Sequence, residues 1–217
     1  MRRHRCWHCG EERPAELVCA SCGAIHRLRD ELDYFAALGL PDHPSVDAEQ
    51  LESSYYALSR QLHPDRHQTS DPDQLAASVR ASALLNQAYR TLRDVESRGR
   101  YWLRRQGDDL GKDNNRVPPS LAAFVFDVQE KLGRLRSADA EERPELKRDL
   151  DETHDEIERQ IRGERDAVTD LLREWPTDVE GGVSLPSSDR SQQLKRHLSE
   201  LSYLKTLDRE VRSGLES

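Results

Sequence analysis

All four cysteines of the chain lie within its first 22 residues, as two Cys-x-x-Cys pairs. Cys6 and Cys9 form the first pair, Cys19 and Cys22 form the second, and a glycine follows each pair. A Cys-x-x-Cys turn points two thiolates at one position, so two such turns complete the tetrahedral sulfur shell that suits Zn²⁺. The spacing therefore predicts a structural zinc site. Because four sulfurs close the shell, no coordination position is left for catalysis.

Three other interpretations of these cysteines are open. Two disulfides would require export, yet the chain begins Met-Arg-Arg-His-Arg with no apolar signal segment. A redox pair would require a βαβ pattern, which is not predicted. A nucleic-acid-binding zinc ribbon is disfavoured because the module is small and only mildly basic. His8 and His26 are expected at the surface, and four arginines are expected to offset the negative charge of a zinc tetrathiolate: Arg2, Arg3, Arg5 and Arg13.

The second motif is the tripeptide His-Pro-Asp at residues 63–65. Asp47 is a candidate helix cap, and Pro64 disfavours helical geometry in the residue before it, so a helix is predicted between them. Asp71-Pro72 can start a second, antiparallel helix. The apolar positions of the first are Leu51, Tyr55, Leu58 and Leu62, and those of the second are Leu75, Val79, Leu85, Ala88, Tyr89 and Leu92. The tripeptide then occupies the loop between two helices, where Asp65 could pair with an arginine of a partner; alternatively it only ends a helix.

A His-Pro-Asp loop between two amphipathic helices is the hallmark of J-domains, and the surrounding motifs resemble those of the HscB family. The matching segments are Asp33-Tyr34-Phe35-x-x-Leu38-Gly39-Leu40-Pro41, Leu62-His-Pro-Asp-Arg66, Leu85-Asn-Gln-Ala-Tyr89 and Arg98-Gly-Arg100-Tyr101-Trp-Leu103. HscB is the J-domain co-chaperone of iron–sulfur cluster biogenesis, and some members carry zinc-binding cysteine pairs. The resemblance implies that the loop docks on a DnaK/HscA-type chaperone and stimulates its ATP hydrolysis. It also implies that the protein is not an enzyme. The residues expected to contact the chaperone, here called the docking set, are Arg60, His63, Pro64, Asp65 and Arg66.

Residues 120–217 carry three helical apolar stripes, each of which needs a partner to be stable. They predict a three-helix bundle, with His154 and His197 at its surface. This part of the chain resembles the bundle with which HscB-family proteins bind an IscU-type scaffold protein. The resemblance implies a scaffold-binding face at Ala122, Ala123, Phe126, Asp127, Glu130 and Tyr203. The family has a bulky pair where this chain has two alanines, so the contact there is expected to be weaker or to be compensated by Leu121, Phe124 or Val125.

Composition supports a mainly α protein. The 217 residues are 34% charged and 6% aromatic, with a mean hydropathy of −0.89, as expected for solvated amphipathic helices. We expect a tetracysteine module at 1–27, a J-domain at 28–107, a linker at 108–119 and the bundle at 120–217. Of the net charge of −8, residues 120–217 contribute 16 basic and 23 acidic side chains, a net of −7.

The sequence thus predicts a cytoplasmic co-chaperone without a membrane span or a nucleic-acid partner. No apolar run approaches the roughly 18 residues of a membrane helix, and the negative charge disfavours nonspecific binding to nucleic acid. Two alternatives are kept: a general J-domain co-chaperone for other clients, and a zinc-ribbon nucleic-acid factor. Whether two chains associate through the cysteine module is open.

Overall fold

The computed structural model describes residues 3–14, 16–26, 32–67, 72–111, 116–176 and 188–216. The predicted cap Asp71, the predicted boundary at residues 27 and 28, part of the predicted linker and the loop before the last helix lie outside these residues. The chain divides into two compact units, residues 1–98 and 99–217, and each is described by itself. Among the described helices, none combines the length and the apolar character that crossing a bilayer requires.

The first unit begins with a short hairpin. Strand β1 (Arg3–Arg5) pairs antiparallel with β2 (Glu12–Pro14), so that Arg3 faces Pro14 and Arg5 faces Glu12. The first Cys-x-x-Cys turn forms the connection between the strands. The chain is mainly α, as predicted. Within the described residues, the sheet consists of the two strands of this hairpin.

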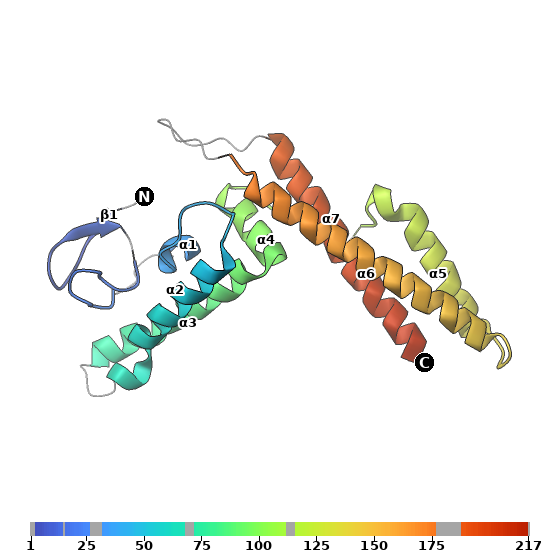
Figure 1. Ribbon diagram of the computed structural model, residues 1–217, viewed down its shortest axis with the longest axis horizontal. Coiled ribbons are helices and arrows are strands. Elements are labelled where there is room, and N and C mark those ends of the chain that lie inside the picture. Colours follow the sequence, from blue (N-terminus) through green and yellow to red (C-terminus); the bar gives the residue numbers. More distant parts are fainter. Residues whose placement is uncertain are drawn as a thin grey trace. The chain divides into compact units, whose positions relative to one another are not determined.

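Four helices follow, and their starts are set by local capping. They are α1 (Tyr34–Ala37), α2 (Ala48–Leu62), α3 (Pro72–Arg93) and α4 (Val95–Arg105). The Asp47 carboxylate accepts the Gln50 backbone N–H at 2.8 Å, which confirms the predicted cap. Helices α2 and α3 run side by side (Figure 1). The predicted burial of Val79 is wrong, since it is 50% exposed: α3 turns Ala77, Ser78 and Ala81 inward instead.

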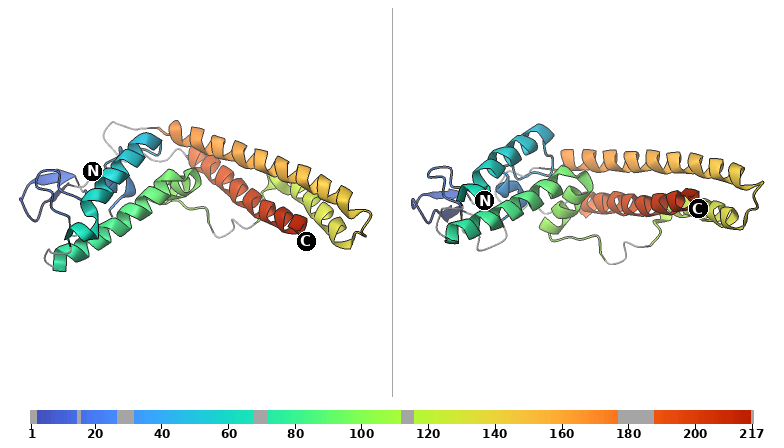
Figure 2. Two further views of the ribbon diagram at one scale, coloured as in Figure 1. Left: turned by 60° about the horizontal axis from the view of Figure 1, so that its bottom comes forward. Right: turned by 90° about the horizontal axis from the view of Figure 1, so that it is seen from below.

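The second unit contains the predicted three-helix bundle. A short 3₁₀ helix, η2 (Pro119–Leu121), leads into α5 (Ala122–Ser137), followed by α6 (Arg143–Arg173) and α7 (Ser188–Glu216). Helices α6 and α7 lie along each other, and the shorter α5 covers part of both (Figures 1 and 2). Their shared core consists of Leu121, Val125, Val128, Leu132, Leu135, Leu146, Leu150, Ile157, Leu204, Leu207 and Val211.

Residues 99–105 of α4 belong to this unit and pack against the start of α7 and the end of α6. A Cβ atom at Gly99 would lie 3.4 Å from both methyl carbons of Leu198, so the small residue allows close approach. Trp102 meets Trp175 edge to face, with ring centroids 6.0 Å apart. Asp108 forms an ion pair with Lys195, which ties the start of the predicted linker to α7.

Two histidine–carboxylate contacts join α6 to α7. The Nδ1 atom of His154 lies 2.7 Å from the Asp208 carboxylate, and that of His197 lies 2.7 Å from the Glu164 carboxylate. The histidine side chains are 21% and 17% exposed, so they lie only partly at the surface where the sequence predicts surface positions. Each sits at the edge of its apolar stripe, where the neighbouring helix covers it.

Glu164→Gln is expected to raise the midpoint of urea unfolding at pH 7. Burial raises the pKa of Glu164, and the neighbouring Glu200 carboxylate adds to the increase, while His197 opposes it. A carboxyl whose pKa is raised on folding stabilises the protein below its unfolded pKa, and this contribution is lost as pH rises through the folded pKa. Glutamine avoids that loss and keeps the oxygen that faces His197.

The gain should therefore disappear below about pH 4, where the wild-type carboxyl is protonated. Urea titrations at the two pH values measure it. Glu152→Gln, which removes an exposed carboxylate from the same helix, is the control. A Glu164→Gln protein less stable than wild type at pH 7 would contradict the prediction.

Candidate functional site

The four cysteine sulfurs lie together although they come from two separate turns. The Sγ atoms of Cys6 and Cys22 are 3.7 Å apart, and those of Cys9 and Cys19 are 3.8 Å apart. All four lie within 4.8 Å of one another. In a tetrahedral site with zinc–sulfur bonds of about 2.3 Å, neighbouring sulfurs are about 3.8 Å apart. The spacing fits a tetrahedral thiolate site, so the cluster is a candidate metal centre.

The two turns have the same backbone design. The amides of Cys6 and Cys19 each donate to the carbonyl five residues further on, at 2.9 Å, and the amides of Gly10 and Gly23 donate back to the cysteine carbonyls at 2.9 and 2.8 Å. The glycines have φ of +74° and +73°, in the left-handed region that side chains disfavour. In both turns, backbone hydrogen bonds fix the conformation that directs the two sulfurs toward the shared cluster.

The thiols influence each other's ionisation. The Cys9 backbone N–H donates to the Cys6 sulfur and lowers the pKa of Cys6 to about 6. At Cys22 the Ala24 backbone N–H acts in the same direction, but desolvation and the other three thiols raise its pKa to about 12. Four thiolates this close repel one another, and a divalent cation would remove that opposition.

One histidine lies beside the cluster. His26 is only 6% exposed, so the expectation of a surface position is wrong. Its backbone N–H donates to the Leu17 carbonyl at 3.0 Å, which turns the chain back, and one ring nitrogen lies within 4.8 Å of the Cys19 sulfur. His8 is exposed, as expected.

The His-Pro-Asp tripeptide enters a 3₁₀ turn, η1 (Pro64–His67), directly after α2. The His63 and Asp65 side chains are 57% and 71% exposed. The Asp65 backbone N–H donates to His63 Nδ1 at 3.3 Å, and the Arg66 backbone N–H donates to the His63 carbonyl at 3.0 Å. The loop therefore has a defined conformation that presents an imidazole and a carboxylate to solvent.

The last carbonyls of α2 receive donors from this loop and from α3. The Arg66 guanidinium donates to the Arg60 carbonyl at 3.1 Å, which brings together two residues of the predicted docking set. The Ser78 and Ser82 hydroxyls donate to the Leu62 carbonyl at 2.6 and 3.0 Å. Carbonyls at a helix end lack intrahelical partners, so these contacts fix where α2 ends and the loop begins.

Two further contacts hold α2 against α3. The Tyr55 hydroxyl donates to Asn86 Oδ1 at 2.8 Å, and the Tyr55 ring stacks on Tyr89 with centroids 4.1 Å apart. Asn86 and Tyr89 belong to the segment quoted above for its resemblance to the HscB family. Their contacts position the two helices that present the loop.

Replacing Ser78 and Ser82 together by alanine is expected to destabilise the α2–α3 pair by about 1–3 kcal/mol, because a buried carbonyl would lose both donors. The loop would lose its anchor on α3, so more of the chaperone partner implied by the J-domain resemblance should be needed for half-maximal ATPase stimulation. Urea unfolding and an ATPase titration measure the two effects. Ser53→Ala, at an exposed position of α2, is the control, and a double variant indistinguishable from it would refute the anchoring role.

The five residues implied on α5 lie on its exposed side, opposite Val125 and Val128 in the core. Phe126 is 72% exposed. The Lys131 ammonium forms ion pairs with Asp127 at 3.3 Å and with Asp149 at 3.1 Å. Exposed together on this helix are Ala122, Ala123, Phe126, Asp127 and Glu130.

Tyr203 on α7 has a different setting. It is partly buried and packs against the bundle core. An aromatic ring there contributes to packing as well as to any surface it shares with a partner.

Comparison with known proteins identifies the family. Residues 33–101 match the family model of the DnaJ domain. The co-chaperone protein HscB homolog of Bordetella petrii is 31% identical over 150 residues, which cover 66% of this chain and 88% of that protein. The chain belongs to the HscB family. A second HscB relative, the iron–sulfur cluster co-chaperone protein HscB homolog of Arabidopsis thaliana, is 30% identical over 127 residues, 58% of this chain and 50% of that protein.

The HscB fold extends over nearly the whole chain. The crystal structure of human co-chaperone protein HscB has a TM-score of 0.70 to this structure at 22% identity, and the match covers 97% of this chain and 98% of that one. It confirms the predicted fold class. The names of these relatives describe co-chaperones, and none of them describes an enzyme.

Sequence reasoning about this HscB-family chain did not find the two serines that anchor the loop. Ser78 and Ser82 lie between Leu75 and Leu85 on an otherwise apolar face of α3. Polar residues at such spacing, close to a predicted helix end on a partner helix, are the signal that could have identified them.

Proposed function

We propose that this HscB-family chain is a co-chaperone of iron–sulfur cluster assembly. Its J-domain stimulates ATP hydrolysis by a DnaK/HscA-type chaperone, and its C-terminal bundle delivers an IscU-type scaffold protein to that chaperone. The observation that carries the proposal is the ordered, exposed His-Pro-Asp loop in a chain that also presents the face at Phe126. We assign the cysteine module to residues 1–27, the J-domain to residues 28–107, the linker to residues 108–119 and the scaffold-binding bundle to residues 120–217.

The loop supports docking through its chemistry and its order. Asp65 offers a carboxylate that can form a charge-assisted, bidentate pair with an arginine of the chaperone. His63, Pro64, Arg60 and Arg66 shape and flank it. Because the carbonyls around the loop already have donors, little conformational entropy is lost on docking.

The exposed side of α5 supports scaffold binding. The Phe126 ring is 72% exposed and shares its side of α5 with the exposed Ala122 and Ala123, so apolar surface is available there for an interface. Asp127 and Glu130 add negative charge beside it, which favours a basic partner surface. The small Ala122 and Ala123 reduce the apolar area, so Phe126 should carry much of the contact, with Tyr203 as the position implied on α7.

We propose zinc as the metal of the cysteine cluster. Sulfur spacings of 3.7 and 3.8 Å fit a tetrahedral thiolate site, and four thiolates with tetrahedral geometry favour Zn²⁺. The role is structural, because Cys6, Cys9, Cys19 and Cys22 fill all four positions. A cytoplasmic location, where a DnaK-type chaperone would be met, belongs to the same proposal.

A chaperone ATPase assay with and without the scaffold tests the central proposal. The chain should stimulate hydrolysis alone, and scaffold and chain together should exceed the sum of their separate effects. Phe126→Ala should weaken scaffold binding and remove the synergy, while Val117→Ala, an exposed apolar control, should preserve both. Stimulation without synergy would instead support a general J-domain co-chaperone for other clients.

A further inference from the structure

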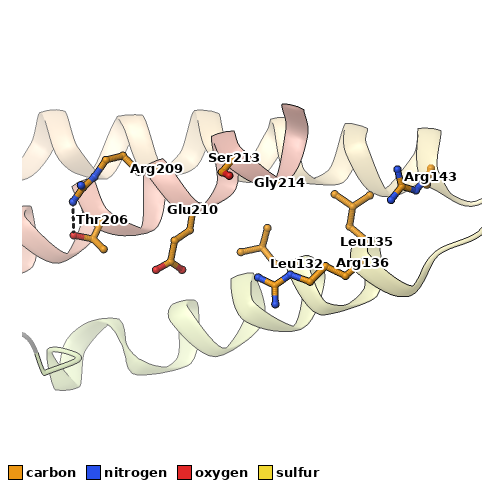
Figure 3. A pocket seen from close by; sticks show the side chains of 9 residues that line it. All are labelled: Leu132, Leu135, Arg136, Arg143, Thr206, Arg209, Glu210, Ser213 and Gly214. Carbon is orange, nitrogen blue, oxygen red and sulfur yellow. Dashed lines mark hydrogen bonds between the residues drawn. The ribbon is translucent and has the colours of Figure 1, made fainter. Parts of the chain in front are cut away.

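A groove lies between α5 and α7 at the end of the bundle where both helices finish (Figure 3). Its volume is about 610 Å³. Leu132 and Leu135 contribute apolar surface from α5, and Gly214 of α7 allows the helices to meet beside it: a Cβ atom there would lie 2.8 Å from a methyl carbon of Leu132. The groove is therefore partly apolar and closed at one place by direct helix contact.

Three arginines from three elements line this groove: Arg136 of α5, Arg143 of α6 and Arg209 of α7. Within the described part of the chain, Arg136 and Arg143 form no side-chain hydrogen bond or ion pair. Arg209 donates to the Thr206 hydroxyl at 3.1 Å and to the Lys205 carbonyl at 3.2 Å, both uncharged groups. The three guanidinium groups are thus left without a carboxylate partner.

The groove brings together three such arginines within an acidic domain. Residues 120–217 hold 16 basic and 23 acidic side chains, and elsewhere Arg159, Arg162 and Arg212 do form ion pairs. The carboxylate that lines the groove, Glu210, accepts from the Gln129 amide at 2.7 Å. The groove therefore contains one carboxylate against three guanidinium groups, and that carboxylate is hydrogen-bonded to an amide.

The position of Arg143 strengthens the argument. It is the first residue of α6, where the positive end of the helix dipole disfavours a cation. Glu142, which precedes Arg143, and Glu145 in the first turn of α6 offset part of this positive charge. An anion in the groove would offset more of it.

We propose that this groove binds an acidic peptide segment of a partner protein. Carboxylates of the segment pair with Arg136, Arg143 and Arg209, and an apolar side chain between them covers Leu132 and Leu135. A peptide fits better than a small anion such as phosphate, because the arginines come from three elements and the leucine floor would stay uncovered. The proposal goes beyond the proposed function and does not rest on it, since the proposed scaffold face at residues 122–130 of α5 and Tyr203 of α7 shares no residue with the lining of the groove.

Fluorescence anisotropy with the full chain tests the proposal, using a labelled peptide of alternating Glu-Glu-Leu repeats as the probe. Saturable binding is expected, and it should weaken as salt is raised from 0.05 to 0.5 M because the charges are exposed to solvent. Arg136→Ala with Arg209→Ala should weaken it at least about tenfold, the effect of losing charged hydrogen bonds. Arg134→Ala, an exposed arginine of α5 that does not line the groove, should change it less than about twofold.

Three outcomes would overturn the proposal. The wild-type chain could fail to bind the peptide at millimolar concentration, the double variant could bind as tightly as wild type, or a peptide with lysine in place of glutamate could bind equally well. Competition by inorganic phosphate at low millimolar concentration would assign the groove to a small anion instead. None of these measurements uses a chaperone or a scaffold, so they succeed or fail independently of the proposed function.

Discussion

Asp65→Asn should abolish the stimulation of chaperone ATP hydrolysis by this chain and leave its fold intact. The Asp65 side chain is 71% exposed, so the substitution removes charge without disturbing the core. Asparagine has nearly the same shape but cannot form the charge-assisted pair with an arginine that the docking proposal requires. Loss of a hydrogen bond between charged groups costs about 1.5–3 kcal/mol, which corresponds to a 10- to 150-fold weaker complex.

The measurement is single-turnover ATP hydrolysis by the chaperone at a concentration of this chain that saturates with wild type. Stability should change by no more than about 0.5 kcal/mol, as at other exposed sites. Asp73→Asn makes the same chemical change at an exposed carboxylate eight residues further on and should stimulate normally. His63→Gln should fail like Asp65→Asn. Full stimulation by Asp65→Asn would exclude the carboxylate from docking.

The elements that position this loop could be predicted because their signals are local. Asp47 caps α2 through the next turn, Pro64 prevents continuation of the helix, and Pro72 begins α3. Each signal acts within about four residues, so it can be recognised in the sequence. The existence and approximate bounds of the bundle helices followed from apolar periodicity for the same reason.

Features that depend on a second element could not be predicted. The hairpin at residues 3–14 has strands of three residues, too short for an alternating pattern. Ser78 interrupts an apolar face of α3, but its acceptor is defined only when α2 brings the Leu62 carbonyl within 2.6 Å. His154 and His197 became half-buried because α6 and α7 meet at their positions. In each case the partner lies between 16 and 54 residues away along the chain, or on another strand.

The site predictions differ in how much local geometry they needed. The cysteine cluster required only the turn geometry of each pair, and its sulfurs came together as expected. The groove at Arg136, Arg143 and Arg209 required the packing of three helices, and the sequence positions give no sign that these arginines share one surface. Charge counts identified residues 120–217 as acidic, but they do not show that three arginines of this domain line one groove.

The cysteine module is expected to lose both its metal and its structure when one ligand is removed. Among the described residues of 3–26, the buried side chains are Cys6, Leu17, Cys19, Ile25 and His26, too few for a stable core in so short a module. Structural zinc contributes roughly 10–16 kcal/mol to the folding of small domains. The module should therefore depend on the metal for its fold.

Cys9→Ser tests this dependence with little effect on packing, because Cys9 is exposed. Wild-type protein purified without oxygen should contain one zinc per chain, and the variant should contain much less. The variant should also be cleaved rapidly by protease within residues 3–26, while its bundle keeps the wild-type unfolding midpoint. His8→Ala, an exposed neighbour, and His26→Ala should retain the metal, because four sulfurs complete the shell without a nitrogen ligand. Wild-type protein without stoichiometric zinc would refute the site. Metal loss from His26→Ala would mean that the His26 ring supplies a nitrogen ligand in place of one of the four sulfurs.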